Sequence, residues 1–254
     1  MKKIAIIGAG ISGLFIANLF KKNSNYQITV YEKSLSIDLD EGYGIQLSVN
    51  SVKLLNQIGF DKFKNDQKFN PDKINFYSIE SSNKICDLNI SEYNSADCKY
   101  TTLKRSELVK FLKKDLENVI KINHSISKIV QQNQKIQLIF ENNETSECDH
   151  LIISDGVFSK SKSLILENQT PPRYNKTLAI RGTIPISQKI NCRNISLFLG
   201  PDFHYVIYPV NQNGDLNFIA IMKYKLNKLE QNNHSLFNDA NFIKRILDKV
   251  PIEM

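Results

Sequence analysis

The sequence contains no tryptophan and only four cysteines, none of them in a C-x-x-C pair. Its four histidines form neither an H-x-x-H nor an H-E-x-x-H pattern. No residue spacing is therefore typical of a zinc site, and we predict free thiols and no bound metal. No apolar run approaches the roughly 18 to 20 residues that a membrane-spanning helix needs, so no membrane span is expected.

The composition is that of a globular protein with a substantial core, because 41% of the 254 residues are hydrophobic and 23% are charged. A net charge of +7 raises the question of a nucleic-acid partner. The basic residues are scattered singly or in pairs, however, and we interpret them as solvated surface charge. The apolar run at residues 4–7 ends at a glycine-rich turn without a signal cleavage site, so we expect a cytoplasmic protein.

Residues 2–32 follow the order strand, tight turn, helix, strand. Residues 4–7 are a short continuous apolar run, which is typical of a strand buried on both faces of a parallel sheet. A broadly apolar helix follows at once and ends near Lys21 and Lys22. Residues 28–31 are a second β-branched strand, so the segment predicts a βαβ unit.

Further elements are expected along the rest of the chain. Asn50 is a candidate helix cap, and Thr101 or Thr102 is expected to cap another helix. A β-hairpin is expected over 126–140 and a buried strand over 151–153. The remaining predictions are short strands at 74–77 and 85–88, antiparallel strands at 178–186, 195–199, 203–209 and 216–222, and a helix over 236–250.

Residues 8–13, GAGISG, fit the pattern G-x-G-x-x-G and lie between the first strand and the helix. Gly8 permits the turn, Gly10 lets the backbone approach a pyrophosphate, and Gly13 allows the helix to pack closely on the strand. Glu32 ends the second strand 19 residues after Gly13 (32 − 13 = 19), close to the spacing at which an acid binds a ribose hydroxyl. The pattern predicts a dinucleotide site, and Glu32 favours FAD or NAD(H) over NADP.

Three later segments extend this pattern: residues 42–50 are GYGIQLSVN, residues 103–108 are LKRSEL, and residues 151–159 are LIISDGVFS. Their order and spacing resemble the G-x-G-I-x-L-x-x-N, R-x-x-L and A-D-G-x-x-S segments of FAD-dependent aromatic hydroxylases, the flavoprotein monooxygenases. The pairs Arg181-Gly182, Tyr208-Pro209 and Asn217-Phe218 are similar to the salicylate-hydroxylase-like branch. The resemblance covers nearly the whole chain.

The resemblance implies an α/β fold of the p-hydroxybenzoate-hydroxylase type. In it a Rossmann-like FAD-binding βαβ domain with a parallel central sheet is joined to an antiparallel β-sheet substrate domain. We expect the discontinuous FAD-binding domain to comprise residues 1–60 and 101–165. The substrate-side domain, which would be partial, is expected to comprise residues 61–100 and 170–254.

The resemblance also implies roles for individual residues along the FAD molecule. Gly8, Gly10 and Gly13 would surround the pyrophosphate, and Glu32 would hold the adenosine ribose. Arg105, at the start of the R-x-x-L segment, would reach the phosphate and ribityl region, a task that suits a rigid fork of donors.

Asp155 would accept hydrogen bonds from the ribityl hydroxyls, and Gly156 would provide the turn that directs it there. Gln46, Arg181 and Tyr208 are candidates for the substrate side of the flavin, with packing in the core or sheet as the alternative interpretation. No residue is predicted to act as a catalytic nucleophile, acid or base.

The activity implied by the resemblance is hydroxylation of a small aromatic substrate. NADH or NADPH would reduce FAD, dioxygen would form a C4a-hydroperoxyflavin, and one oxygen atom would pass to the ring. The cofactor would carry this chemistry, and the protein would bind and orient the reactants. Two alternatives stay open: an NAD-dependent dehydrogenase, and a truncated, non-catalytic protein that only binds FAD or another nucleotide. The absence of tryptophan argues against a flavin halogenase.

The sequence departs from the family pattern in three places. Ile153 and Ser154 precede Asp155 where small residues are usual, and Lys162 stands where arginine is expected, which keeps the charge but loses bidentate geometry. The family's G-D-A-x-H segment has no counterpart, because Gly214-Asp215 is expected to be a turn. We therefore expect the C-terminal part of the fold to be missing, and a separate C-terminal fragment is a candidate partner. Retention of FAD is the property that we expect this departure to weaken.

Overall fold

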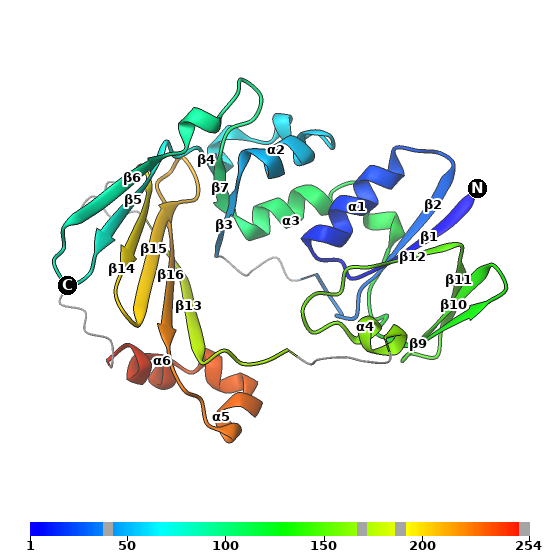
Figure 1. The fold of residues 1–254 in the computed structure, drawn as a ribbon. Helices are drawn as coiled ribbons and strands as arrows, with labels where there is room; N and C mark the ends of the chain where they lie inside the picture. The colour runs from blue at the N-terminus through cyan, green and yellow to red at the C-terminus, as the bar shows by residue number, and fades with distance from the viewer. Residues whose placement is uncertain (38–42, 167–171, 186–191, 249–254) are drawn as a thin grey trace. The chain divides into compact units, whose positions relative to one another are not determined.

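The computed structural model describes residues 1–37, 43–166, 172–185 and 192–248 (Figure 1). Packing divides the chain into two units. Unit 1 comprises Met1–Glu41, Lys53–Phe63 and Arg105–Arg173, and unit 2 comprises Gly42–Val52, Lys64–Lys104 and Tyr174–Met254. None of the helices in the described ranges combines the length and the apolar character needed to cross a membrane.

Unit 1 is built on a four-stranded parallel sheet in the order β12-β1-β2-β8. The strands are β1 (Lys2–Ile7), β2 (Tyr26–Tyr31), β8 (Ile120–Lys121) and β12 (His150–Ile153). Helix α1 (Ile11–Lys21) connects β1 to β2, so the predicted βαβ unit is confirmed. Ile6, Leu14 and Val30 are fully buried, as expected for a parallel sheet covered by a helix.

The other elements of unit 1 surround this sheet. Helix α3 (Arg105–Lys113) lies against α1, where the Asn18 amide donates a hydrogen bond to the carbonyl of Leu112 at 2.7 Å. The hairpin predicted over 126–140 is present, with Asn133 at φ 54° in its turn. It belongs to an antiparallel sheet of β9 (Ile126–Gln132), β10 (Lys135–Phe140) and β11 (Thr145–Cys148). The smaller elements of unit 1 are helix α4 (Lys160–Ile165) and the 3-10 helices η1 (Phe60–Lys62) and η4 (Glu117–Val119).

Unit 2 contains a six-stranded sheet in the order β13-β16-β15-β14-β5-β6. Neighbouring strands are antiparallel, as predicted, except that β14 and β5 are parallel. Gly214, at φ 88°, lies in the predicted turn between β15 and β16. The strands are β5 (Lys73–Ser78), β6 (Lys84–Asn89), β13 (Thr177–Ile184), β14 (Ile195–Leu199), β15 (Phe203–Pro209) and β16 (Leu216–Lys223).

A second sheet in unit 2 has the order β3-β7-β4, with β3 (Gly44–Leu47), β7 (Thr101–Lys104) and β4 (Lys68–Phe69). The prediction that Thr101 or Thr102 caps a helix is wrong, because both lie in β7 and α3 begins at Arg105. β-Branched side chains suit a strand. The hydroxyl of Thr102 also donates to the carbonyl of Pro209 at 2.5 Å, which ties β7 to the end of β15.

Two further helix predictions need correction. Helix α2 (Val49–Asn56) begins before Asn50, which therefore lies inside the helix and does not cap it. The predicted helix over 236–250 is α6 (Ala240–Leu247), which begins later because the Asp239 carboxylate caps the backbone N–H of Phe242 at 2.7 Å. Residues 249 and 250 lie outside the described residues. The remaining elements of unit 2 are α5 (Lys228–Asn232) and the 3-10 helices η2 (Asn65–Gln67), η3 (Ser91–Tyr93) and η5 (His234–Asn238).

Candidate functional site

The glycine-rich loop between β1 and α1 is packed so tightly that two of its positions have no room for a side chain. A Cβ atom on Gly8, which has φ +99°, would lie 2.6 Å from the carbonyl oxygen of Ser154, and one on Gly13 would lie 2.0 Å from the carbonyl oxygen of Gly8. The Ser154 hydroxyl donates to the carbonyl of Ile7 at 2.8 Å. Ser154 thus binds the end of β12 to the end of β1.

Gly10 differs from the other two glycines, because a Cβ atom there would meet nothing within 4 Å. The backbone at Gly10 is therefore open on the side where a ligand would approach. Helix α1 starts immediately after it, with no side-chain cap and no acidic residue in its first turn. Its first N–H groups are available to an anion, which the helix dipole also favours.

Glu32 connects the end of β2 to this loop. One oxygen of its carboxylate accepts the backbone N–H of Ala9 at 2.8 Å, and the other accepts the N–H of Ser34 at 3.0 Å. A carboxylate offers about four acceptor positions, so two backbone bonds leave capacity for ribose hydroxyls. The acid predicted to recognise a ribose therefore lies beside the glycine loop.

A cavity of about 500 Å³ opens at this place in unit 1. Its wall includes five of the seven residues predicted to bind the cofactor, namely Gly8, Gly10, Glu32, Asp155 and Gly156. Gly13 lies behind the loop in α1, and Arg105 begins α3 without lining this cavity. The volume is within the range of ordinary ligand sites. The other wall residues include Tyr31, Lys33, His124, Ser125 and Phe158, which the sequence patterns did not single out.

Asp155 combines a lowered pKa with an unused hydrogen-bonding oxygen. Burial alone would raise the pKa of this carboxyl, but hydrogen bonds from Ser159 and from the backbone of Ser161 outweigh burial and lower it. Its Oδ2 atom accepts the Ser161 N–H at 3.0 Å, whereas Oδ1 is buried without a hydrogen-bond partner among the described residues. A buried carboxylate oxygen without a donor is costly, so this position suits a ligand that supplies hydroxyl groups.

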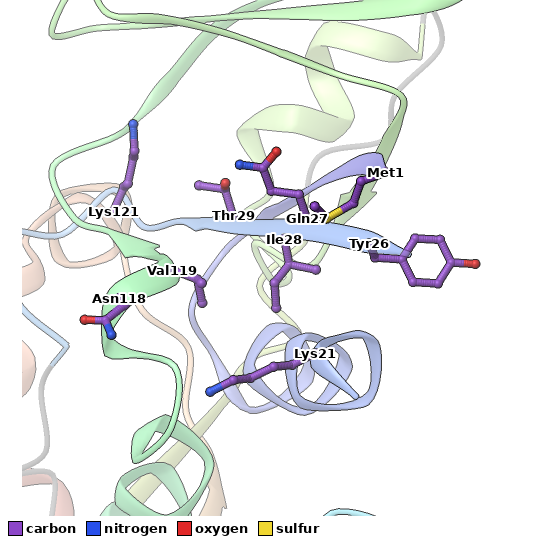
Figure 2. Close-up of a pocket in the computed structure, with 9 residues that line it drawn as sticks. All are labelled: Met1, Lys21, Tyr26, Gln27, Ile28, Thr29, Asn118, Val119 and Lys121. Carbon is purple, nitrogen blue, oxygen red and sulfur yellow. The ribbon is translucent and has the colours of Figure 1, made fainter. Parts of the chain in front are cut away.

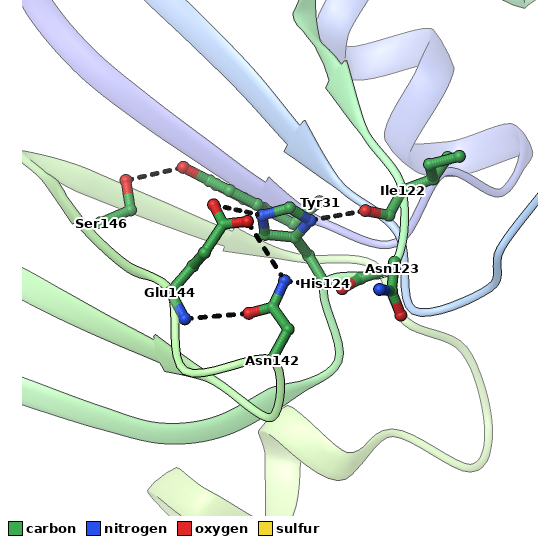
Figure 3. Close-up of polar contacts among 7 residues, drawn as sticks. All are labelled: Tyr31, Ile122, Asn123, His124, Asn142, Glu144 and Ser146. Carbon is green, nitrogen blue, oxygen red and sulfur yellow. Dashed lines mark hydrogen bonds and ion pairs between the residues drawn. The ribbon is translucent and has the colours of Figure 1, made fainter.

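His124 lines the same cavity. Figure 3 shows the polar contacts that hold its ring in place. Its Nδ1 atom lies 2.6 Å from the carbonyl oxygen of Ile122, and its Nε2 atom lies 3.1 Å from a carboxylate oxygen of Glu144. The neighbouring Tyr31 ring, 5.4 Å from the His124 ring, donates its hydroxyl hydrogen to Ser146 at 2.6 Å. No sequence pattern marks this histidine, because its side-chain partner Glu144 lies 20 residues later, in the turn of a separate hairpin.

Another hollow in unit 1, of about 360 Å³, lies along β2 and the segment that contains η4 and β8 (Figure 2). Its wall carries Lys21, Gln27 and Lys121 but none of the predicted site residues and no carboxylate. We therefore place the candidate site at the glycine loop. Within the described ranges, no three His, Cys, Asp or Glu side chains come together as a potential metal site.

In unit 2, the three residues predicted for the substrate side lie near one another. The hydroxyl of Tyr100 donates to Oε1 of Gln46 at 2.8 Å, and the guanidinium of Arg181 lies 5.1 Å from the centre of the Tyr43 ring. Burial raises the pKa of Tyr208 to about 12, against the opposing effects of the Gln46 amide and the Arg181 charge. Tyr208 is only 1% exposed, whereas Arg181 is exposed.

Close packing joins two of the sequence motifs in unit 2. A Cβ atom on Gly44 would lie 2.7 Å from Val210 and 2.8 Å from Asn217. The Gly44 N–H also donates to the side-chain oxygen of Asn217, which is fully buried. The second glycine of the G-x-G-I segment is thus needed because Val210 and Asn217, more than 160 positions later in the sequence, leave no room for a side chain there.

Comparison with known proteins agrees with the motifs. Residues 6–37 match the model of the NAD(P)-binding Rossmann-like domain. The chain is 27% identical to the FAD-dependent monooxygenase pigN of Monascus ruber and 24% identical to a salicylate hydroxylase of Pseudomonas putida. Each alignment covers 86% of this chain and 54% of the relative. The chain therefore spans about half the length of these relatives.

Among solved structures, the chain is similar to HpxO of Klebsiella pneumoniae complexed with FAD and uric acid. The TM-score is 0.79 at 18% sequence identity, over 98% of this chain and 65% of HpxO. This likeness confirms the predicted fold class. The sequence relatives are FAD-dependent monooxygenases of the salicylate-hydroxylase type, so the family resemblance read from the motifs is confirmed as well.

Proposed function

We propose that this chain is an FAD-binding oxidoreductase of the aromatic hydroxylase type. The observation that carries the proposal is the cavity in unit 1, where the open backbone at Gly10, the Glu32 carboxylate and the unpartnered Asp155 oxygen lie in one wall. An elongated ligand with a pyrophosphate between two polyhydroxylated groups matches this order of acceptors and donors. FAD is such a ligand, so the residues present fit the cofactor.

Each cofactor-binding residue has a proposed task. The first N–H groups of α1 and the loop of Gly8 and Gly10 hold the pyrophosphate, while Gly13 keeps α1 close to β1. Glu32 accepts hydrogen bonds from the adenosine ribose, and Asp155 accepts them from the ribityl chain. Arg105, whose guanidinium is permanently charged, is proposed to reach a phosphate from the start of α3.

The proposed reaction is the NADH- or NADPH-dependent hydroxylation of a small aromatic substrate with dioxygen. Bound FAD supplies the redox and oxygen chemistry, and this chain's residues bind and orient the reactants. Gln46 and Arg181 are proposed to contact the substrate, with the buried Tyr208 supporting them. The proposed domain roles are cofactor binding for residues 1–60 and 101–165 and substrate binding for residues 61–100 and 170–254.

We also propose that a separate C-terminal polypeptide is a partner of unit 1. The short stretch 153–166 exposes six large apolar side chains next to the cavity: Ile153, Val157, Phe158, Leu164, Ile165 and Leu166. An exposed apolar patch of this kind commonly marks an interaction surface. The only strand paired with β12 among the described residues is β1, so the other edge of β12 is open to a further strand. The cytoplasmic location predicted from the sequence stays a prediction.

The test is titration of the purified protein with FAD, followed by flavin fluorescence and absorbance. We expect saturable binding that Glu32→Ala weakens at least about tenfold, because this change removes the ribose acceptor, whereas the surface variant Glu147→Ala binds FAD like the unchanged protein. Binding of NADH without FAD would support the dehydrogenase instead. Flavin binding without NADH oxidation, across a panel of phenols, would support the non-catalytic alternative.

A further inference from the structure

A chain of polar side chains runs across unit 2 from Tyr100, just before β7, through β3 to β15. Tyr100 donates its hydroxyl hydrogen to Oε1 of Gln46 at 2.8 Å, and the side chain of Gln46 in turn hydrogen-bonds the hydroxyl of Tyr208. The backbone supports this arrangement, because Gln46 pairs with Thr102 on β7, and the Thr102 hydroxyl donates to the carbonyl beside Tyr208 at 2.5 Å. Gln46 is therefore held between two tyrosines.

The direction of these hydrogen bonds fixes which way the amide of Gln46 faces. Its oxygen accepts from Tyr100, so its nitrogen faces Tyr208. An amide nitrogen has two hydrogens, so one N–H of Gln46 is left for a ligand.

The groups around this N–H all favour a negatively charged acceptor. Arg181 is exposed, contacts the Tyr43 ring and has no ion pair among the described residues. The buried amide of Asn217 uses its oxygen for Gly44, which leaves its nitrogen as a further donor near Tyr208. The cluster of Tyr43, Gln46, Tyr100, Arg181, Tyr208 and Asn217 contains one cation and no carboxylate.

We propose that Tyr100 is a positioning residue, which holds the Gln46 amide so that Gln46 and Arg181 together select an aromatic ligand with an anionic oxygen. Without the Tyr100 hydroxyl, the amide is free to rotate and to present its oxygen to the ligand. That orientation repels an anion and accepts a neutral donor. The inference rests on the proposed function, because it treats this cluster as the substrate side.

The test compares two probes of nearly equal size, salicylate and its neutral analogue salicylamide, by isothermal titration calorimetry with the FAD-loaded protein. We expect the unchanged protein to bind salicylate at least about tenfold more tightly than salicylamide. Tyr100→Phe should bring this ratio below about threefold while FAD affinity and thermal stability stay nearly the same. Tyr77→Phe is the matched control on a strand of the large sheet, where Tyr77 stacks on Phe198, and it should leave the ratio unchanged.

A second variant and a second measurement keep the test decisive. Gln46→Glu, which cannot donate a hydrogen bond, should make salicylamide the better ligand. In the unchanged protein, the side-chain amide protons of Gln46 should exchange with water more slowly than in the Tyr100→Phe variant. An unchanged probe ratio in Tyr100→Phe, or no preference for salicylate in the unchanged protein, would overturn the inference. Repeating the titrations without FAD separates this result from a failure of the proposed function, which would instead appear as absent FAD binding.

Discussion

The glycine loop of unit 1 and the Gln46 cluster of unit 2 are candidate sites of opposite construction. The loop is a continuous segment in which Gly8 and Gly13 are defined by the absence of side chains. The cluster depends on side chains from several strands, among them Gln46 on β3 and Arg181 on β13. An added side chain should therefore abolish cofactor binding at the glycine loop, whereas loss of a single hydrogen bond should change the ligand preference of the Gln46 cluster.

The largest expected effect is that of Gly13→Ala. The new Cβ atom would lie 2.0 Å from the carbonyl oxygen of Gly8, a backbone atom that cannot move without displacing α1 from β1. Overpacking in a core costs about 1 to 3 kcal/mol, and a clash with the backbone should reach the upper end or exceed it. We expect a clearly lowered denaturation midpoint and no measurable FAD binding.

Gly10→Ala is the matched control within the same loop, because its Cβ atom would meet nothing within 4 Å. This variant should fold as stably as the unchanged protein and lose affinity only for the dinucleotide. Equal stability of the Gly13 and Gly10 variants in urea denaturation would refute the distinction between a packing glycine and a ligand-facing one.

The same contrast explains what the sequence predicts and what it does not. The loop and Glu32 follow from spacing, since a local turn and a βαβ unit are encoded by neighbouring residues. His124 and Tyr100 are missed, because their roles depend on strands that pair only after folding. Thr102 is misread as a helix cap, because threonine suits both a cap and a strand and only tertiary pairing with β3 and β4 decides between them.

Gly44→Ala tests the close packing of the G-x-G-I segment against Val210 and Asn217 in unit 2. Its Cβ atom would lie 2.7 Å from Val210 and 2.8 Å from Asn217, which are buried side chains with limited freedom. We expect a loss of about 1 to 3 kcal/mol in the free energy of unfolding. Gly182→Ala, where a Cβ atom meets nothing within 4 Å, is the control. Equal denaturation midpoints for the two variants would show that the close packing at Gly44 does not stabilise the fold.

Asp155→Asn should produce a smaller, pH-dependent effect. The pKa of Asp155 is lowered in the folded protein, so its ionised form stabilises the fold above the unfolded pKa of about 3.9, and this stabilisation is lost as the pH falls through the folded pKa. Solvent screening limits it to less than about 1 kcal/mol. The difference in Tm between the two proteins should be present at pH 7 and shrink as the pH falls below the unfolded pKa of about 3.9. A difference that grows toward low pH would contradict the assignment.

Glu144→Gln should have the smallest effect. It tests whether FAD binding at the cavity of unit 1 depends on a network of side chains, as we propose for ligand binding at the Gln46 cluster. The Glu144 side chain is 57% exposed, and its carboxylate lies 3.1 Å from Nε2 of His124. The backbone N–H of His124 donates to the carbonyl of Glu32 at 2.8 Å, and the change does not remove either group. Because the Glu144 side chain is mostly exposed, its contact with His124 contributes little, so we expect a loss of about 0.5 kcal/mol or less and unchanged FAD affinity in fluorescence titrations. A tenfold loss of FAD affinity would instead mean that this wall, like the cluster, is positioned by its side-chain network.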